Sequence, residues 1–247
     1  MDPAVLREDM VDGLESPTKG ALDDEAVAIA MRDVPRHEFL EDDRAAYADR
    51  AHEVLETRVL APSTVARLFE VLALEEGDDV LIVGAGVGYT AAVAAEIVGE
   101  HGVHAVDISR PLVAEARANL ERAGYEGVLV DWRDGAGGLP EYAPFDRILL
   151  EAAAVDPPRR LLDQLADGGR LVLPRGTQPQ RITAVDADGS SDEFNAVSFD
   201  PLLLEGEQSG AVERNRTNRE DVEYARQRAE SRTGWEQEWI AWDDRLR

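Results

Sequence analysis

The chain has 247 residues, enough for one large α/β domain, and its 51 acidic against 26 basic residues give a net charge of −25. This charge repels phosphate backbones, so we expect no nucleic-acid partner. Cysteine is absent, which excludes disulfides, thiolate nucleophiles and cysteine-ligated zinc, and the four histidines show no metal-binding spacing, so we predict no metal site. No segment approaches the ~18 consecutive apolar residues of a membrane span, and residues 1–10 lack a signal-peptide layout, so we expect a cytoplasmic protein without a membrane partner.

Residues 1–60 are predicted to form a helical segment on the substrate side of the molecule. Apolar residues at helical spacing predict a short first helix: Leu6, Met10, Val11 and Leu14. A second helix is expected over Asp23–Met31, ending near Pro35, because the residue before a proline disfavours helix. Residues 40–58 follow neither period and are left unassigned. A third helix is expected to begin at Pro62.

Residues 61–205 alternate between strand and helix patterns. Strands are predicted over residues 79–83, 103–107, 128–131, 145–150 and 170–173, and helices over residues 89–98, 111–123 and 158–166. This alternation predicts an α/β fold with a Rossmann-like, doubly wound, mostly parallel sheet. Two further runs, 181–186 and 193–200, flank Asp188-Gly189 and predict a terminal antiparallel hairpin.

Residues 206–247 form a charged tail rich in Arg and Glu. Trp235, Trp239 and Trp242 recur at i, i+4 and i+7, which would place the three indoles on one face of a helix. Packing of this face on the protein's own domain and an interface with a second subunit or partner are both open.

A glycine-rich loop follows the first predicted strand, with the sequence Gly84-Ala85-Gly86-Val87-Gly88. Such a loop between a strand and a helix lets backbone approach a nucleotide closely. The dinucleotide fingerprint G-x-G-x-x-G needs a third glycine where this chain has Tyr89, so the spacing favours S-adenosylmethionine over NAD. A purely structural turn is the alternative.

Acidic residues follow the next strands. Asp107 ends the second strand, next to Ile108, and its carboxylate can accept hydrogen bonds from both ribose hydroxyls of an adenosine. Asp134 follows the third strand and can accept from an adenine amino group, while Gly135 relaxes the turn. Glu151 follows the fourth strand and could contact the methionine end of the cofactor, the methyl acceptor, or solvent. The predicted cofactor site is therefore Gly84, Ala85, Gly86, Gly88, Asp107, Ile108, Asp134 and Gly135.

The order of these motifs over residues 10–208 resembles the protein-L-isoaspartate O-methyltransferases, a branch of the class I methyltransferases. The segments that carry the resemblance are Ala30–Phe39, Val80–Ala92, Asp107, Asp134-Gly135, Pro144–Asp146, Gly168–Pro174 and Phe199–Leu202. The resemblance implies S-adenosylmethionine-dependent methylation of isoaspartyl carboxylates in damaged proteins or peptides, as protein repair. Lys19 is the only lysine, and acid enrichment with so little lysine is typical of proteins adapted to concentrated salt, so we expect a haloarchaeal member.

Two positions depart from the family pattern. Ile82 stands where the family usually has Glu or Asp, and the serine regarded as the family's active-site residue falls on Leu60, which cannot form a hydrogen bond. The catalytic residues are therefore unknown, and Asp49, Arg58 and Glu151 are conceivable substitutes. Two alternatives stay open: a methyltransferase with another acceptor, and a non-catalytic binding protein.

Overall fold

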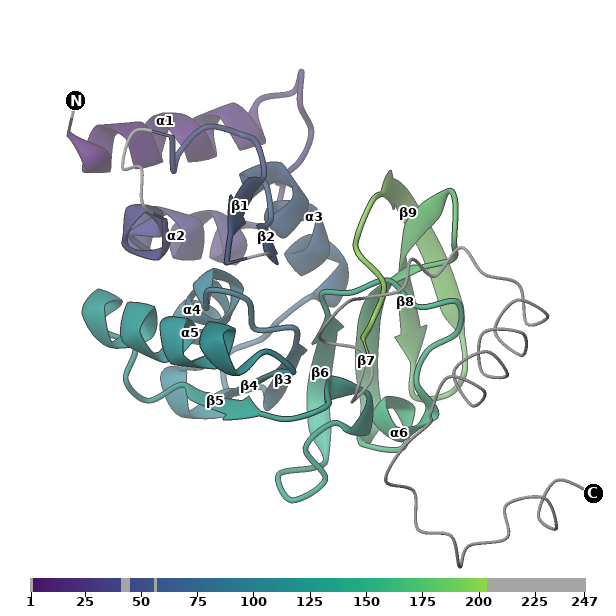
Figure 1. The fold of residues 1–247 in the computed structure, drawn as a ribbon. Coiled ribbons are helices and arrows are strands. Elements are labelled where there is room, and N and C mark those ends of the chain that lie inside the picture. The colour runs from purple at the N-terminus through teal and green to yellow at the C-terminus, as the bar shows by residue number, and fades with distance from the viewer. Residues whose placement is uncertain (1, 41–44, 56, 204–247) are drawn as a thin grey trace, which may run out of the picture. The chain divides into compact units, whose positions relative to one another are not determined.

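The computed structural model describes residues 2–40, 45–55 and 57–203 (Figure 1). The tail with Trp235, Trp239 and Trp242 lies outside the described residues, and its interface stays a prediction. The division of the chain at residues 60 and 205 also stays a prediction. Across the described ranges, none of the helices has the length and apolar character needed to cross a membrane.

The N-terminal part contains two helices and a short 3₁₀ turn: α1 (Pro3–Glu15), α2 (Glu25–Asp33) and η1 (Arg36–Phe39). Helix α1 buries Met10, Val11 and Leu14, which confirms the predicted apolar stripe. Helix α2 begins two residues later than predicted. Asp24 is its N-cap, because the Asp24 side chain accepts hydrogen bonds from the backbone N–H groups of Ala26 and Val27.

A small antiparallel hairpin occupies the region that the sequence left unassigned. It consists of β1 (His52–Val54) and β2 (Thr57–Val59), which pair only with each other. Strands of three residues are too short to show a clear alternation, which is why no pattern was visible. Strand β2 leads directly into α3 (Pro62–Leu72), the predicted third helix.

The main sheet has seven strands in the order β5-β4-β3-β6-β7-β8-β9. Their bounds are β3 (Val80–Val83), β4 (Val103–Asp107), β5 (Leu129–Trp132), β6 (Phe145–Leu150), β7 (Leu165–Arg175), β8 (Gln180–Asp186) and β9 (Ser191–Val197). The first five strands in this order, from β5 through β4, β3 and β6 to β7, pair in parallel. Strand β8 pairs antiparallel with both β7 and β9, so the predicted Rossmann-like sheet with a terminal hairpin is confirmed. The remaining helices are α4 (Tyr89–Val98), η2 (Glu100–Gly102), α5 (Arg110–Ala123), η3 (Gly135–Gly137) and α6 (Arg159–Leu162).

The predicted helix over residues 158–166 is wrong at its C-terminal end. Helix α6 stops at Leu162, and Leu165 already pairs with Phe145 as the start of β7. The register then shifts across Gly168-Gly169 before Arg170 pairs with Arg147. A bulge of this kind inserts extra residues into one strand and interrupts its alternating pattern. For this reason the sequence of residues 163–166 was predicted as the end of a helix. Strand β9 also ends at Val197, short of the predicted Asp200.

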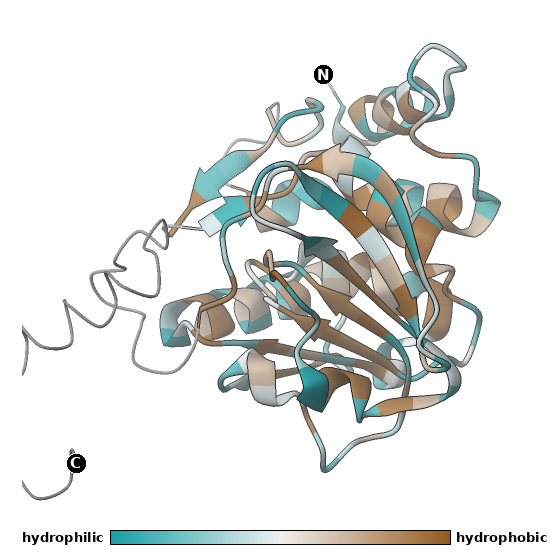
Figure 2. Ribbon diagram, turned by 90° about the vertical axis from the view of Figure 1, so that its right-hand side faces the viewer, coloured by the Kyte–Doolittle hydropathy of each residue, from teal (hydrophilic) through white to brown (hydrophobic). Residues whose placement is uncertain are grey.

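The apolar core lies on both faces of the sheet. Residues of β3 alternate between two buried clusters, with Val80 and Ile82 on the side of the N-terminal helices and Leu81 and Val83 on the other side. Figure 2 shows the apolar residues concentrated on the central strands. Burial on both faces is characteristic of a central parallel strand, and it explains the continuous apolar run 80–83.

The buried side chain of Arg36 connects the N-terminal part to the remainder of the fold. Its Nε donates to the carbonyl of Ala46 at 2.8 Å, and its Nη2 donates to the carbonyl of Leu60 at 2.6 Å. Its guanidinium carbon lies 4.3 Å from the ring centre of Tyr89, the first residue of α4. Burial lowers the pKa of Arg36 from its ordinary value.

Replacing Arg36 with methionine should lower the free energy of unfolding by about 2–4 kcal/mol, because two buried carbonyls lose their donors. Urea denaturation at fixed salt measures the change. Arg50→Met is the control, since Arg50 is exposed and its replacement should change stability by less than about 0.5 kcal/mol. An Arg36→Met protein with the wild-type midpoint would show that this residue does not hold the segments together.

Candidate active site

The loops that follow β3, β4 and β5 meet at the carboxyl edge of the sheet. The N–H groups of Gly84 and Ala85 both donate to the carbonyl of Val106, at 2.8 and 3.0 Å. The N–H of Arg133 donates to the carbonyl of Asp107 at 3.1 Å, which joins the third loop to the second. The predicted cofactor residues therefore come together, although they are distant in sequence.

The glycines of the first loop are required by the backbone. Gly84 has a φ of 95° and Gly88 a φ of 93°, both in the left-handed region that L side chains rarely adopt. In the third loop, a Cβ on Gly135 would lie 2.3 Å from Cγ1 of Val83, so only glycine allows this loop to pack against β3. A glycine-rich loop that packs this closely and a carboxylate at the end of the next strand are the groups expected of an S-adenosylmethionine site, so the residues present fit this cofactor.

Asp107 has a second role that the sequence did not reveal. Its Oδ2 accepts a hydrogen bond from the N–H of Gly86 at 3.0 Å, and its Oδ1 accepts one from the N–H of Ser109 at 2.8 Å. Burial raises the pKa of Asp107, and these backbone hydrogen bonds oppose the increase. The N–H of Ile108 also acts on this carboxylate, and its two oxygens together offer about four acceptor sites, so one site remains for a ligand hydroxyl. Asp107 can thus bind a ribose while it braces the glycine loop.

Asp134 and Ile108 lie at the same edge. The Asp134 side chain accepts from the N–H of Ala136 at 2.9 Å and caps η3. The carbonyl of Ile108 accepts a hydrogen bond from the indole N–H of Trp132 at 3.0 Å. Trp132 pairs with Asp107 in the sheet and is 56% exposed, so an indole stands at the rim of the predicted adenosine site.

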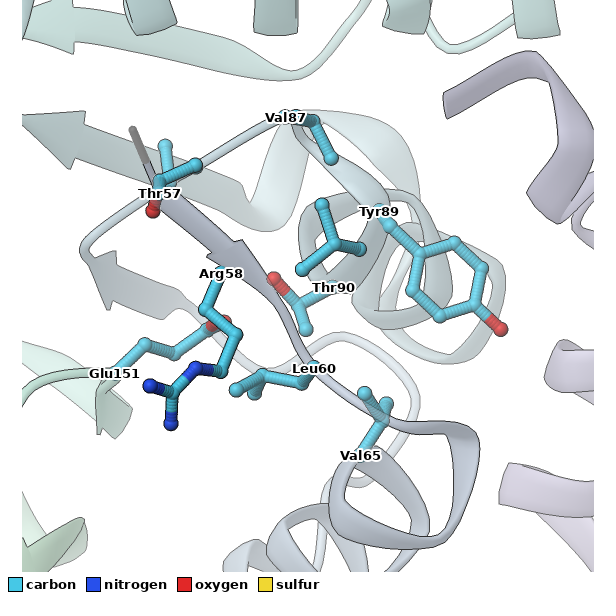
Figure 3. Close-up of a pocket in the computed structure, with 11 residues that line it drawn as sticks. Thr57, Arg58, Leu60, Val65, Val87, Tyr89, Thr90 and Glu151 are labelled. Atoms are coloured by element: carbon cyan, nitrogen blue, oxygen red, sulfur yellow. The ribbon is translucent and has the colours of Figure 1, made fainter. Parts of the chain in front are cut away.

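A small pocket that is partly open to solvent adjoins the glycine loop. Strand β2 and the residue after it contribute Thr57, Arg58 and Leu60, the loop contributes Ala85 and Gly86, and Glu151 contributes from the end of β6 (Figure 3). The pocket therefore joins the hairpin, which the sequence did not predict, to the cofactor side.

Glu151 is held at the point where β3 and β6 end. Its N–H donates to the carbonyl of Val83 at 2.8 Å, and its Oε1 is buried without a hydrogen-bond partner among the described residues. Burial raises the pKa of Glu151 to about 8; a hydrogen bond with Thr90 opposes this increase and the charge of Asp107 adds to it. The sequence left three contacts open for Glu151: the methionine end of the cofactor, the methyl acceptor, and solvent. The structure favours a contact inside the pocket over exposure to solvent.

The other two conceivable substitutes for the family serine lie differently. Oδ1 of Asp49 accepts from the N–H of Ser63 at 2.9 Å, and Oδ2 forms an ion pair with Lys19 at 2.6 Å, so Asp49 stabilises the start of α3. Arg58 is partly exposed at the pocket and donates to the carbonyl of Ser198 at 3.4 Å. Leu60 itself lines the pocket.

The strand order, the glycine loop and the acid at the end of β4 define the class of protein: a Rossmann-like α/β fold of the class I methyltransferase type. A sequence profile of the protein-L-isoaspartate(D-aspartate) O-methyltransferase family matches residues 7–203, and the chain belongs to this family.

Relatives agree with this family assignment, and solved structures share the fold. The protein-L-isoaspartate O-methyltransferase of Methanosarcina mazei is 43% identical over 203 residues, covering 81% of this chain and 82% of that protein. The enzyme of the same name from Methanococcoides burtonii is 42% identical and covers 73% of this chain and 93% of that protein. A family structure from Plasmodium falciparum, in complex with S-adenosyl-L-homocysteine, covers 80% of this chain and 98% of that chain, with a TM-score of 0.72 at 21% identity. Another solved protein-L-isoaspartate O-methyltransferase has a TM-score of 0.71 at 28% identity, covering 80% of this chain and 66% of that one.

Glu151→Gln should become more stable than the wild type as the pH rises. Because the folded-state pKa of about 8 lies above the ordinary value of 4.5, the folded protein holds this proton more tightly than the unfolded chain, and stability is lost between these two values. Glutamine carries no such proton. Urea denaturation at pH 5 and pH 8.5 should show a relative gain of roughly 1–3 kcal/mol for the variant. The exposed residue Glu53, changed to Gln, should show no such pH-dependent gain.

Proposed function

We propose that the protein is an S-adenosylmethionine-dependent O-methyltransferase that methylates isoaspartyl carboxylates in damaged proteins or peptides. The observation that carries the proposal is the Asp107 carboxylate, which is bonded to the Gly86 N–H at the carboxyl edge of the sheet in a member of this family. The named activity of the Methanosarcina mazei relative supports the same acceptor.

Cofactor binding is assigned to the three loops. We propose that Gly84, Ala85, Gly86 and Gly88 approach the cofactor with backbone, that Asp107 and Ile108 hold its ribose, and that Asp134 and Gly135 contact its adenine. Strand β3 lies between β4 and β6, so the order in which successive strands are added to the sheet reverses at β3. Open α/β sheets bind ligands at such a reversal of strand order. When bound, S-adenosylmethionine supplies a methyl group on a positively charged sulfur.

The pocket beside these loops is assigned to the acceptor. Methyl transfer needs the acceptor oxygen about 3 Å from the methyl carbon and in line with the bond that breaks. A carboxylate is already nucleophilic, so no general base is required. The apolar side chains of Val59, Leu60 and Val65 line the pocket and would remove water from the acceptor, which makes a carboxylate more reactive.

We also propose a division of roles along the chain and a cellular location for the protein. Residues 1–60 act on the substrate side, since β2 contributes to the pocket, and residues 61–205 bind the cofactor. The acidic, lysine-poor composition supports a cytoplasmic protein of a salt-rich cell, with protein or peptide substrates as its partners.

Titration calorimetry in molar KCl tests the cofactor, and methyl transfer to a matched pair of isoaspartyl and aspartyl peptides tests the acceptor. We expect micromolar binding of S-adenosylhomocysteine and methylation of the isoaspartyl peptide alone. Binding without methylation would favour another acceptor or a binding protein, and it would agree with Leu60 at the serine position. Absence of binding would overturn the cofactor assignment.

Asp107→Ala should weaken S-adenosylhomocysteine binding by about 1.5–3 kcal/mol, roughly 10–150-fold, because a charged acceptor is lost and the glycine loop loses its brace. Calorimetry measures the affinity, and circular dichroism checks the fold. Asp163→Ala removes an exposed carboxylate at the end of α6 and should leave the affinity unchanged. Equal affinities for the two variants would remove Asp107 from the site.

A further inference from the structure

Two residues set the polarity of the proposed acceptor pocket, Leu60 and Glu151. At the wall formed by β2, Leu60 replaces the serine that the family resemblance places there, so this wall offers no hydroxyl to an acceptor. Glu151, which follows β6, lines the same pocket with a buried, unpartnered Oε1 (Figure 3). A buried oxygen without a partner is costly unless a ligand or a proton satisfies it.

We propose that Glu151 binds the methyl acceptor by donating a hydrogen bond from its carboxylic acid group to the acceptor carboxylate, in place of the hydroxyl lost at Leu60. This inference rests on the proposed isoaspartyl methyltransferase function. A protonated carboxyl group is an O–H donor like serine, and its bond to a carboxylate is charge-assisted and therefore strong.

The surroundings of Glu151 favour the neutral form. Burial and the negative charge of Asp107 on β4 raise the pKa of Glu151, and the hydrogen bond with Thr90 of α4 opposes only part of this increase, while Tyr89 faces the pocket without charge. Arg58 faces it from β2, but its recorded ion pair is with Asp200 at 4.0 Å. The resulting pKa of about 8 leaves Glu151 mostly protonated at pH 7.

The protonation state decides whether an acceptor carboxylate can bind. An ionised Glu151 would repel the acceptor, whereas the neutral acid holds it. During transfer, the acceptor oxygen forms the bond to the methyl carbon, the carbon–sulfur bond breaks with its electron pair going to sulfur, and Glu151 keeps its proton. Acceptor binding should therefore weaken as the pH rises above about 8.

Two substitutions at Glu151 separate this role from its alternatives. Glu151→Gln keeps a neutral donor, so kcat/KM for an isoaspartyl peptide should stay within about threefold of the wild type at pH 7 and should lose the decline above pH 8. Glu151→Ala removes the donor, so KM for the peptide should rise about tenfold or more while the Kd for S-adenosylhomocysteine changes less than about threefold. These fold-changes correspond to one lost charge-assisted hydrogen bond.

A rescue variant tests the substitution of one donor by another. Leu60→Ser in the Glu151→Ala background should restore most of the lost affinity for the peptide, because it returns a hydroxyl to the β2 wall. Asp163→Asn, an exposed change at the end of α6, is the control and should leave KM and the pH profile unchanged.

Each alternative role gives a different result and would overturn the proposal. Loss of kcat in Glu151→Gln would indicate a general base acting on a different kind of acceptor. A tenfold increase in the Kd for S-adenosylhomocysteine in Glu151→Ala would indicate a contact to the cofactor. Wild-type KM values in both variants would make Glu151 a spectator. A wild-type protein that binds S-adenosylhomocysteine but does not methylate the peptide would instead refute the proposed function, and this inference with it.

Discussion

The parallel pairing of β3 with both β4 and β6 is the constraint on which the site depends. Because all three strands run in the same direction, the residues that follow them emerge at one edge of the sheet. Gly84 follows β3 and Glu151 follows β6, and a Cβ on Gly84 would lie 3.4 Å from the Cβ of Glu151. The cofactor loop and the acceptor pocket are thus neighbours because of strand order, before any side chain contributes.

The substrate side is held to this edge by a buried charge. Arg36 donates to the carbonyl of Leu60, and so fixes the backbone at the position onto which the family resemblance places a serine. Its guanidinium also lies against Tyr89, the first residue of α4, which begins where the glycine loop ends. One side chain therefore sets the position of β2 relative to the loop. Burying an arginine is costly, and hydrogen bonds to two carbonyls and the aromatic face offset part of that cost.

The sequence predicted the parts of the fold that have a strong local period. The apolar run 80–83, the Gly-rich loop and Asp107 were recognisable because buried parallel strands and tight loops restrict residue type. The hairpin of β1 and β2 was missed because three-residue strands carry no period. The end of α6 was misplaced because the bulge at Gly168-Gly169 depends on pairing with β6, which lies outside the local sequence.

In the site, too, the sequence predicted what depends on local pattern and missed what depends on contacts between distant segments. Asp107 was predicted as a ribose ligand from its place at a strand end, but its bond to the N–H of Gly86 required the folded loop. For Glu151, the sequence could not choose between solvent, cofactor and acceptor. The choice between these contacts depends on how far the Glu151 side chain is buried. Strand β2 and helix α3 line the pocket around Glu151, and no local sequence pattern predicts that they meet the end of β6.

The large negative charge of the chain acts on the surface and in the pocket in different ways. At high salt, exposed carboxylates more than a few ångströms apart barely interact, since the Debye length is about 3 Å at 1 M. The pKa of Glu151 is raised first by burial, a cause that salt does not screen, and Asp107 acts on it through the protein interior. A chain with so many acids can therefore keep one of them protonated near neutral pH whatever the salt concentration. In the role proposed for Glu151, acceptor binding depends on that interior proton and not on the surface charge.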